Sequence, residues 1–421
     1  MTTNTKSRNA RRKKTGNESR RERGTHRERD EYGEYKLSRK EQKKIKKAKR
    51  KRKLIAMLAV EFVLILVLGV CVFGLSKIGK LQNLGVDPDE VGQNEDMDAN
   101  TAELLKGYTN IALFGLGSRT PGSLGEGELS DTIIIASINN ETKEVRLMSV
   151  YRDTYLNRAD DTYGKCNAAY SKGGPKQAME MLNTNLDLNI KYYVSIDFTA
   201  LIKTVDLLGG VEIDVKEEEI DAINGYMYET TEIAEKAEDD SINPYNDFIT
   251  EPGLQTLYGV QATAYCRIRK VGNNDFERTE RQRRVIEQIV EKAKSAGLGT
   301  INSIIDEVFP LIATNIPQTT LIGMAASMMS YELGESSGFP SYRSDARMDG
   351  QQVVVPADLV ANVTELHKFL FDEDDYYPSP TVLEINDKII ADTGVTAQET
   401  DSSSPPSAAP ASPPGRWSRR R

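Results

Sequence analysis

The sequence predicts a mixed α/β fold that follows a single membrane-spanning helix. Short apolar runs rich in β-branched residues alternate with longer segments whose apolar residues recur every three or four positions, which is typical of an α/β fold. A separate apolar segment, residues 54–75, carries a single charge at Glu61. As a helix it would extend about 33 Å, which is enough to cross a bilayer.

The charge differs in sign on the two sides of residues 54–75. Residues 1–53 hold 23 Lys and Arg against 7 Asp and Glu, whereas the residues after 75 hold 32 against 55. Because positive charge gathers on the cytoplasmic side of membrane segments, we expect a cytoplasmic N-terminus and an extracytoplasmic main domain. A cleaved signal peptide is disfavoured, since its basic region would be unusually long and no small-x-small cleavage pattern follows.

These contrasts divide the chain into six segments. They are a basic disordered cytoplasmic tail (1–53), a transmembrane helix (54–75), an extracytoplasmic linker (76–107), a main domain (108–296), a C-terminal helical extension or subdomain (297–397) and a Ser/Pro-rich disordered tail (398–421). Whether the fifth segment is a separate module or completes the main domain stays open.

The main domain begins with three predicted strands. They are Ile111–Phe114, Thr132–Ile138 and Val145–Val150, the last two joined by a turn at 139–143. A hairpin that folds near Glu141 places residue 131 opposite residue 151. Asp131 and Arg152 would then emerge at the same end of adjacent strands.

Hydrophobic periodicity and glycine positions predict the later elements. They are a helix over 175–186, a strand over 192–196, a helix over 198–208, strands over 211–215 and 262–268, a helix over 277–295, helices near 300–313 and 317–332, and a helix with short flanking strands over 353–394. The acidic stretch 216–258 reads as an irregular surface insertion.

Several arginines adjoin these apolar elements. In a strand over 262–268, alternation would send Arg267 and Arg269 to one face. Extending the apolar stripe of the 277–295 helix backwards turns Arg278, Arg281 and Gln282 inward, at the positive end of the helix dipole. The same helical phase leaves Arg283 and Glu287 off that face.

Guanidinium groups held near a core need a strong anion, and phosphate or pyrophosphate suits their planar, multi-donor geometry. With only His26 and His367 in the chain, a His-dependent triad or His-ligated zinc site is disfavoured. No Walker loop, G-x-G-x-x-G or G-x-S-x-G pattern occurs. Outside the membrane segment, Cys166 and Cys266 are expected as two separate core residues, with a disulfide as the alternative.

In combination, the charged segments resemble the LytR-CpsA-Psr family of bacterial cell-wall enzymes over about residues 108–296. The segments that carry the resemblance are NIALFG (110–115), SDTI (130–133), RDT (152–154), LGGV (208–211), RIR (267–269) and DFERTERQ (275–282). The resemblance implies a three-layer α/β/α sandwich with an apolar groove for a polyprenyl chain. It also implies a phosphotransferase that moves an anionic glycopolymer, of the teichoic acid or capsule type, from undecaprenyl pyrophosphate to a peptidoglycan hydroxyl.

The same resemblance assigns roles to individual residues. The pyrophosphate-binding positions are Arg152, Arg267, Arg269, Arg278 and Gln282, with Arg119 as a weaker candidate. Asp131 falls on a Mg²⁺-ligand position. The catalytic candidates are Arg152 and Asp275, and Asp275 would act as a metal ligand or as the base for the attacking hydroxyl. A pyrophosphatase side activity is compatible with this set.

Two positions depart from the family pattern. A second metal-binding aspartate is usual where this chain has Gly117, and an arginine is often found where it has Leu129. Losing one carboxylate should weaken Mg²⁺ binding, because such sites rely on one or two carboxylates plus substrate phosphate. The site could borrow another ligand, bind the metal only with substrate, or be catalytically impaired.

Three hypotheses follow. The first is the membrane-anchored phosphotransferase, and the second is a non-catalytic polyprenyl-phosphate-binding scaffold or regulator with an impaired metal site. The third is a regulator that binds nucleic acid through its basic tail. It is the weakest, because residues 1–53 contain no recognisable DNA-binding fold and membrane topology explains their charge, so no nucleic-acid partner is expected.

Overall fold

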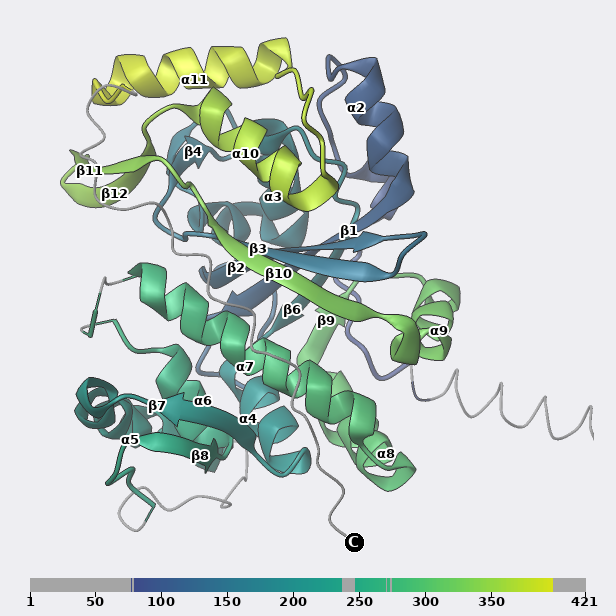
Figure 1. Ribbon diagram of the computed structural model, residues 1–421, viewed down its shortest axis with the longest axis vertical. Helices are drawn as coiled ribbons and strands as arrows, with labels where there is room; N and C mark the ends of the chain where they lie inside the picture. Colours follow the sequence, from purple (N-terminus) through teal and green to yellow (C-terminus); the bar gives the residue numbers. More distant parts are fainter. Residues whose placement is uncertain (1–76, 78, 237–246, 270, 273–274, 397–421) are drawn as a thin grey trace, which may run out of the picture. The chain divides into compact units, whose positions relative to one another are not determined.

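The computed structural model describes residues 77, 79–236, 247–269, 271–272 and 275–396 (Figure 1). The predicted transmembrane helix and the two predicted disordered tails lie outside the described residues. Among the helices of the part that is described, none combines the length and the hydropathy that a bilayer crossing requires.

The strands are β1 (Tyr108–Leu116), β2 (Ser130–Asn139), β3 (Glu144–Val150), β4 (Tyr155–Asn157), β5 (Tyr163–Lys165), β6 (Tyr192–Ile196), β7 (Val211–Val215), β8 (Gly253–Leu257), β9 (Ile312–Thr314), β10 (Glu332–Phe339), β11 (Arg343–Met348) and β12 (Gln351–Pro356). The α-helices are α2 (Ala99–Leu104), α3 (Ala168–Leu186), α4 (Phe198–Leu207), α5 (Ile220–Lys236), α6 (Gly259–Cys266), α7 (Asp275–Ser295), α8 (Leu298–Glu307), α9 (Gln318–Ala326), α10 (Leu359–Phe371) and α11 (Pro380–Thr393).

A six-stranded mixed sheet forms the centre of the domain, in the order β10-β3-β2-β1-β6-β9. The predicted hairpin is confirmed, since β2 pairs antiparallel with β3 and Ile134 lies opposite Ser149. Continuing that register places Asp131 opposite residue 152, one residue from the predicted partner. The predicted strand over 192–196 is also confirmed as β6, which runs parallel to β1.

Helices cover both faces of this sheet, with α3, α10 and α11 on one side and α7 on the other (Figure 1). Alternation along β2 explains how one strand serves both sides. Ile133 and Ile135 pack in the cluster that contains the side chains of α3 and α10. Ile134 and Leu147 pack on the opposite face, where Ile286 of α7 joins them.

The structure corrects the prediction for residues 216–258. Instead of an irregular insertion, this stretch holds α5 and β8, with residues 237–246 outside the described part. Strand β8 pairs antiparallel with β7, and Ile223 and Met227 of α5 are fully buried beside them. Exposed acidic residues such as Asp221 and Glu232 share α5 with these buried side chains, and they obscured its amphipathic stripe.

The predicted strand over 262–268 is wrong, because Gly259–Cys266 is the helix α6. Every residue of α6 is buried, so the segment has no solvent-exposed face. Without one, a short apolar run cannot be assigned to helix or strand from periodicity alone. Arg267 and Arg269 therefore follow a helix end rather than alternating along a strand.

The segment after residue 297 contributes to the central sheet. Strands β9 and β10 form its two edges, so the predicted boundary at 297 does not coincide with a break in the sheet. The helices predicted near 300–313 and 317–332 are present but shorter, as α8 and α9. Each predicted helix ran on into sheet residues because the apolar pattern continues across the helix end.

Candidate functional site

A cavity of about 480 Å³ lies between the central sheet and the helices α4, α6 and α7, on the face of the sheet that α7 covers. Most of its wall is apolar. The apolar lining residues are Leu113, Phe114, Leu116, Ile134, Val194, Ile196, Phe198, Leu201, Val285, Ile286 and Ile289. The branched side chains of α7 recur at helical spacing and line the cavity, where they contribute to this apolar wall.

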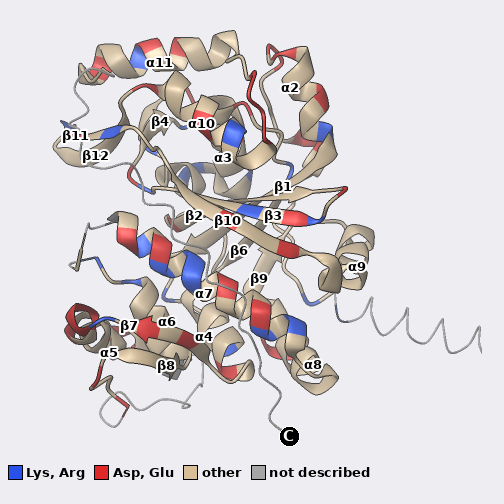
Figure 2. Cartoon of the chain, viewed as in Figure 1, with Lys and Arg blue, Asp and Glu red and all other residues tan. Residues whose placement is uncertain are grey.

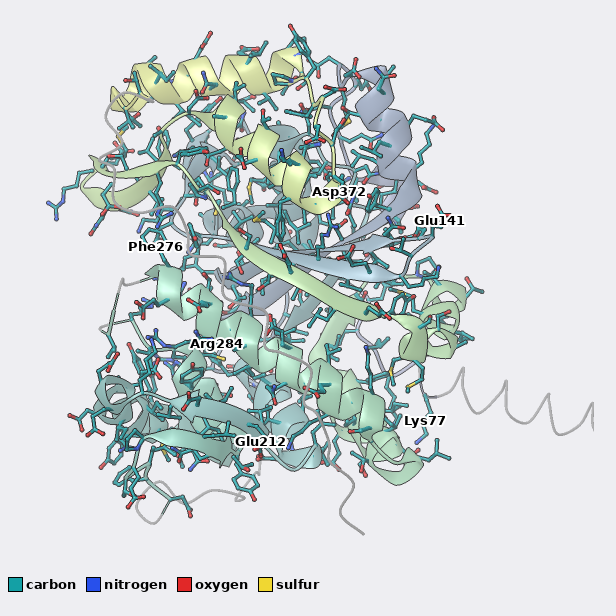
Figure 3. The ribbon with its side chains drawn as sticks, viewed as in Figure 1. Lys77, Glu141, Glu212, Phe276, Arg284 and Asp372 are labelled. Atoms are coloured by element: carbon teal, nitrogen blue, oxygen red, sulfur yellow. The ribbon has the colours of Figure 1, made fainter. Side chains whose placement is uncertain are left out.

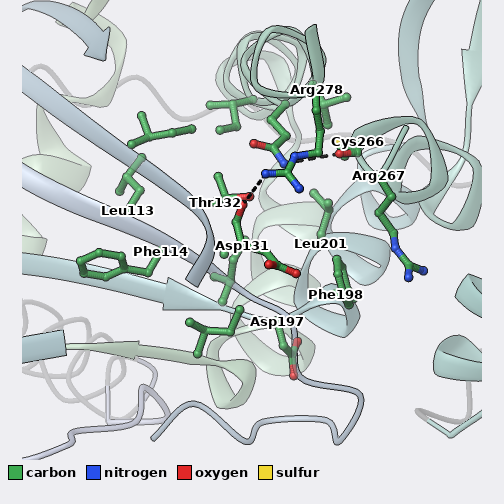
Figure 4. A pocket seen from close by; sticks show the side chains of 18 of the residues that line it. Leu113, Phe114, Asp131, Thr132, Asp197, Phe198, Leu201, Cys266, Arg267 and Arg278 are labelled. Atoms are coloured by element: carbon green, nitrogen blue, oxygen red, sulfur yellow. Dashed lines mark hydrogen bonds between the residues drawn. The ribbon is translucent and has the colours of Figure 1, made fainter. Parts of the chain in front are cut away.

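The other lining residues make this cavity polar at one end, where the ends of several elements converge (Figure 4). Asp131 lies at the start of β2, whereas Arg278 and Gln282 lie in the first two turns of α7. Arg119, Arg267 and Arg269 come from the segments that follow β1 and α6. Five of the six predicted pyrophosphate-binding residues and the predicted metal ligand therefore line one cavity.

The sixth, Arg152, reaches this end of the cavity through Asp131. Its Nη1 forms an ion pair with an oxygen of the Asp131 carboxylate, and a second contact of 3.6 Å joins its Nε to Asp153. The side chains of Arg152 and Asp131 are 16% and 29% exposed, so both remain within reach of a ligand. The prediction that these two residues meet is confirmed.

Helix α7 supplies the deepest polar groups. Arg278 is 2% exposed and its Nη2 donates to the backbone oxygen of Asp131 at 3.2 Å. Gln282 is 8% exposed and its Nε2 donates to the backbone oxygen of Cys266 at 3.4 Å. Its Oε1 is buried without a hydrogen-bond partner among the described residues, which leaves one acceptor for a ligand donor. Both residues face inward, as predicted.

The other charged residues of α7 have structural contacts. Arg281 faces inward but does not line the cavity, because its Nε donates to Glu219 at 2.7 Å. Arg283 was expected off the inward face, yet it is buried and donates to Ser149 and Ser336. Helix α7 is in contact with β3 and β10 on a second side, and the sequence pattern did not indicate that contact. Figure 2 shows the charges that follow one another along α7.

Arg267 is held by groups that the sequence did not indicate. Its Nη2 donates to Glu229 Oε2 at 2.6 Å and its Nη1 to Thr230 Oγ1 at 3.1 Å. The rings of Phe198 and Tyr226 lie 4.9 and 5.3 Å from its guanidinium carbon. All four partners come from α4 and α5, and the part of the sequence that forms α5 was interpreted as an insertion.

Asp197 is a further residue of the site that sequence reasoning missed. It caps α4, where its Oδ1 accepts from the backbone nitrogen of Ala200, and its Oδ2 accepts from Gly122 at 2.6 Å. The second contact ties the loop after β1 to the cavity. Burial raises the pKa of this carboxyl. An aspartate before an apolar helix was a recognisable cap signal, but nothing indicated the contact with the loop.

The residues at the predicted metal position hold a single carboxylate. A Cβ on Gly117 would lie 3.0 Å from Asp131 Oδ2, so an aspartate there would place two carboxylates side by side. Within the described residues, no group of three His, Cys, Asp or Glu residues has metal-site geometry. Asp275 is the first residue of α7, and its side chain lies outside the described residues. Phe276 marks this end of the helix in Figure 3.

Cys166 and Cys266 are both buried and unpaired with each other, as expected of two separate core residues. Cys266 lines the cavity, and burial raises the pKa of its thiol to about 12. It therefore remains a neutral thiol at physiological pH and adds to the apolar wall.

The chain is similar to several known proteins in sequence and in fold. Residues 78–362 match the LytR_cpsA_psr family. Over 296 residues the chain is 27% identical to polyisoprenyl-teichoic acid–peptidoglycan teichoic acid transferase TagV of Bacillus subtilis (strain 168), which covers 69% of this chain and 68% of that protein. Over 244 residues it is 30% identical to the transferase TagU of Enterococcus faecalis (strain ATCC 700802 / V583), covering 56% and 71%. The crystal structure of gbs0355 from Streptococcus agalactiae has a similar fold, with a TM-score of 0.52, 24% identity, and coverage of 68% of this chain and 94% of that chain.

Proposed function

The chain belongs to the LytR-CpsA-Psr family, and from that premise we propose that it transfers an anionic glycopolymer from a polyprenyl pyrophosphate carrier to a peptidoglycan hydroxyl. We further propose that residues 54–75 anchor it in the cell membrane, with the catalytic domain outside the cytoplasm. The relatives named above are teichoic acid transferases, which makes a teichoic acid the first glycopolymer to test.

One observation carries the proposal: a single cavity joins an apolar wall to a cluster of arginines. The wall of leucine, isoleucine and valine side chains suits a polyprenyl chain, which can form no hydrogen bonds. The arginines at the other end suit the charged pyrophosphate, because guanidinium groups bind phosphate oxygens through paired N–H donors. An amphiphile with a phosphate head fits both ends at once.

In the proposed reaction, an oxygen of the acceptor hydroxyl attacks the phosphorus that bears the glycan. A bond forms from this oxygen to phosphorus, the bond to the bridging oxygen breaks, and polyprenyl phosphate leaves with the bonding electrons. Arg152 and Arg278 are placed to neutralise charge on the phosphate oxygens. Gln282 Oε1 is available to accept from another donor group of the substrate. We assign the proton of that hydroxyl to Asp275.

Mg²⁺ is part of the proposal, with Asp131 as its protein carboxylate. The Asp131 carboxylate at the cavity fits a cation that completes its ligand set with substrate phosphate and water. Such an ion would supply charge neutralisation at the transferred phosphate. Arg152 contacts the same carboxylate, so it holds Asp131 in place in the ligand-free protein.

The proposal is tested with intact spheroplasts that express the full chain and a polyprenyl-pyrophosphate-linked teichoic acid precursor. A membrane-impermeant peptidoglycan fragment is added outside, and transfer of glycan to it is measured. We expect Mg²⁺-dependent transfer without lysis. Transfer only after lysis would contradict the proposed topology, and no transfer in either case would contradict the enzyme.

A second candidate function, a carrier-binding protein without catalysis, is favoured by the glycine at position 117. We expect Gly117→Asp to increase Mg²⁺ affinity in the absence of substrate by about tenfold, because it adds a carboxylate beside Asp131. Calorimetry on the full chain in detergent measures this affinity. Tighter Mg²⁺ binding with increased transfer indicates an enzyme with a weakened metal site. Transfer in neither form, with the carrier still bound, indicates the second candidate.

A further inference from the structure

Glu229 of α5 contacts two of the cavity arginines at once. Its Oε1 forms an ion pair with Arg119 Nη2, and its Oε2 accepts from Arg267 Nη2 at 2.6 Å. Arg119 belongs to the segment after β1, and Arg267 directly follows α6. One carboxylate therefore joins three separate parts of the chain at the polar end of the cavity.

The guanidinium of Arg267 is well satisfied in this arrangement. Besides Glu229 it donates to Thr230, and it lies against the rings of Phe198 and Tyr226. Figure 4 shows its side chain directed away from Asp131 and Arg278. The ligand-free protein thus holds this arginine by α5, apart from the groups around Asp131.

The position of Glu229 corresponds to that of an anionic ligand. Its two oxygens each engage one guanidinium, as two oxygens of a phosphate group would. The side chain is 33% exposed, whereas Arg119 and Arg267 are 66% and 15% exposed. The pair with Arg119 is exposed and therefore weak, so a doubly charged phosphate can displace the carboxylate there first; the pair with Arg267 is more buried.

We propose that Glu229 is an internal competitor for the phosphate site, which occupies Arg119 and Arg267 until a ligand displaces it and which returns when the product leaves. This inference rests on the proposed function, since it names a residue that sets affinity at the same site. In this role Glu229 keeps both arginines neutralised in the empty cavity and lowers the affinity for the polyprenyl phosphate product.

The test is Glu229→Gln in the full chain in detergent, with inorganic pyrophosphate and geranyl pyrophosphate as probes. Glutamine keeps the size of the side chain and removes its charge. We expect the Kd for both probes to fall about tenfold, because the ligand no longer displaces two partly exposed ion pairs. In the transfer assay KM and kcat should fall together, as product release slows. The matched control, Glu232→Gln, removes an exposed charge from the same helix and should leave each value unchanged.

A second variant separates this inference from the proposed function. Arg267→Ala should weaken binding of both probes, and in that background Glu229→Gln should give a smaller gain. Suppose that the wild-type chain binds the probes and that Arg267→Ala weakens this binding. If Glu229→Gln then binds the probes no more tightly than wild type, the role of Glu229 as a competitor is refuted, whereas the proposed phosphate site stands. If neither probe binds to any variant, the proposed function itself fails.

Discussion

Replacing Arg152 with alanine is expected to lower kcat/KM for glycopolymer transfer by about 100- to 1000-fold, the usual effect of removing one preorganised donor from a transition-state site. Arg152 contacts the Asp131 carboxylate at the polar end of the cavity and is 16% exposed. The variant loses a guanidinium near the transferred phosphate and leaves Asp131 without that ion pair. Arg152→Lys should recover only part of the rate, because it restores the charge but not the forked donors.

The control for this prediction is Arg347→Ala, which removes an exposed arginine of β11 and should retain wild-type activity. Transfer rates and carrier binding are measured on the same preparations. A loss of rate with carrier binding intact would locate the role of Arg152 in the transition state. An Arg152→Ala enzyme with near-normal kcat/KM would contradict the assignment of this residue.

The second large effect concerns stability. Glu219→Ala is expected to lower the free energy of unfolding by about 3–5 kcal/mol, the cost of breaking a buried ion pair from one side. Glu219 and Arg281 are 1% and 2% exposed, and Arg281 also donates to the backbone oxygens of Ile268 and Val271. Removing the carboxylate therefore leaves a buried guanidinium whose remaining counter-ion is the partly exposed Glu277, at 3.0 Å. Urea denaturation of the full chain in detergent, followed by circular dichroism, measures the change.

Glu280→Gln on the same helix is the matched control. Its ion pair with Arg284 is 42% and 40% exposed, so the expected cost is below about 0.5 kcal/mol. The double variant Glu219→Leu, Arg281→Met should be more stable than Glu219→Ala, because it buries no unpaired charge. If Glu219→Ala and Glu280→Gln lowered the free energy of unfolding equally, burial would not strengthen the ion pair between Glu219 and Arg281.

The ion pair between Glu219 and Arg281 also affects the candidate site. Ile268 and Val271 flank Arg269, and Arg281 holds their backbone oxygens from α7. The buried pair thus positions the segment that carries two predicted phosphate ligands. Sequence reasoning turned Arg281 inward correctly but did not find its partner, since Glu219 is 62 residues away in the acidic stretch interpreted as surface.

The local sequence pattern was sufficient to predict structure where strand alternation or helical periodicity was clear. The β2–β3 hairpin, its charged end with Asp131 and Arg152, and the inward face of α7 were all predictable, because alternation and helical phase decide which side chains share a face. The same reasoning failed for α6, which is buried on all sides and has no solvent-exposed face to reveal its helical period.

By itself, the sequence predicted the residues of the candidate site: an inward-facing arginine cluster, the carboxylate of Asp131 and a glycine at 117. Only the tertiary structure decided what those arginines contact without ligand. Glu229 meets Arg267 across 38 residues of sequence, and Glu219 meets Arg281 across 62. Such partners are set by how helices pack rather than by local periodicity, so no spacing in the chain indicates them.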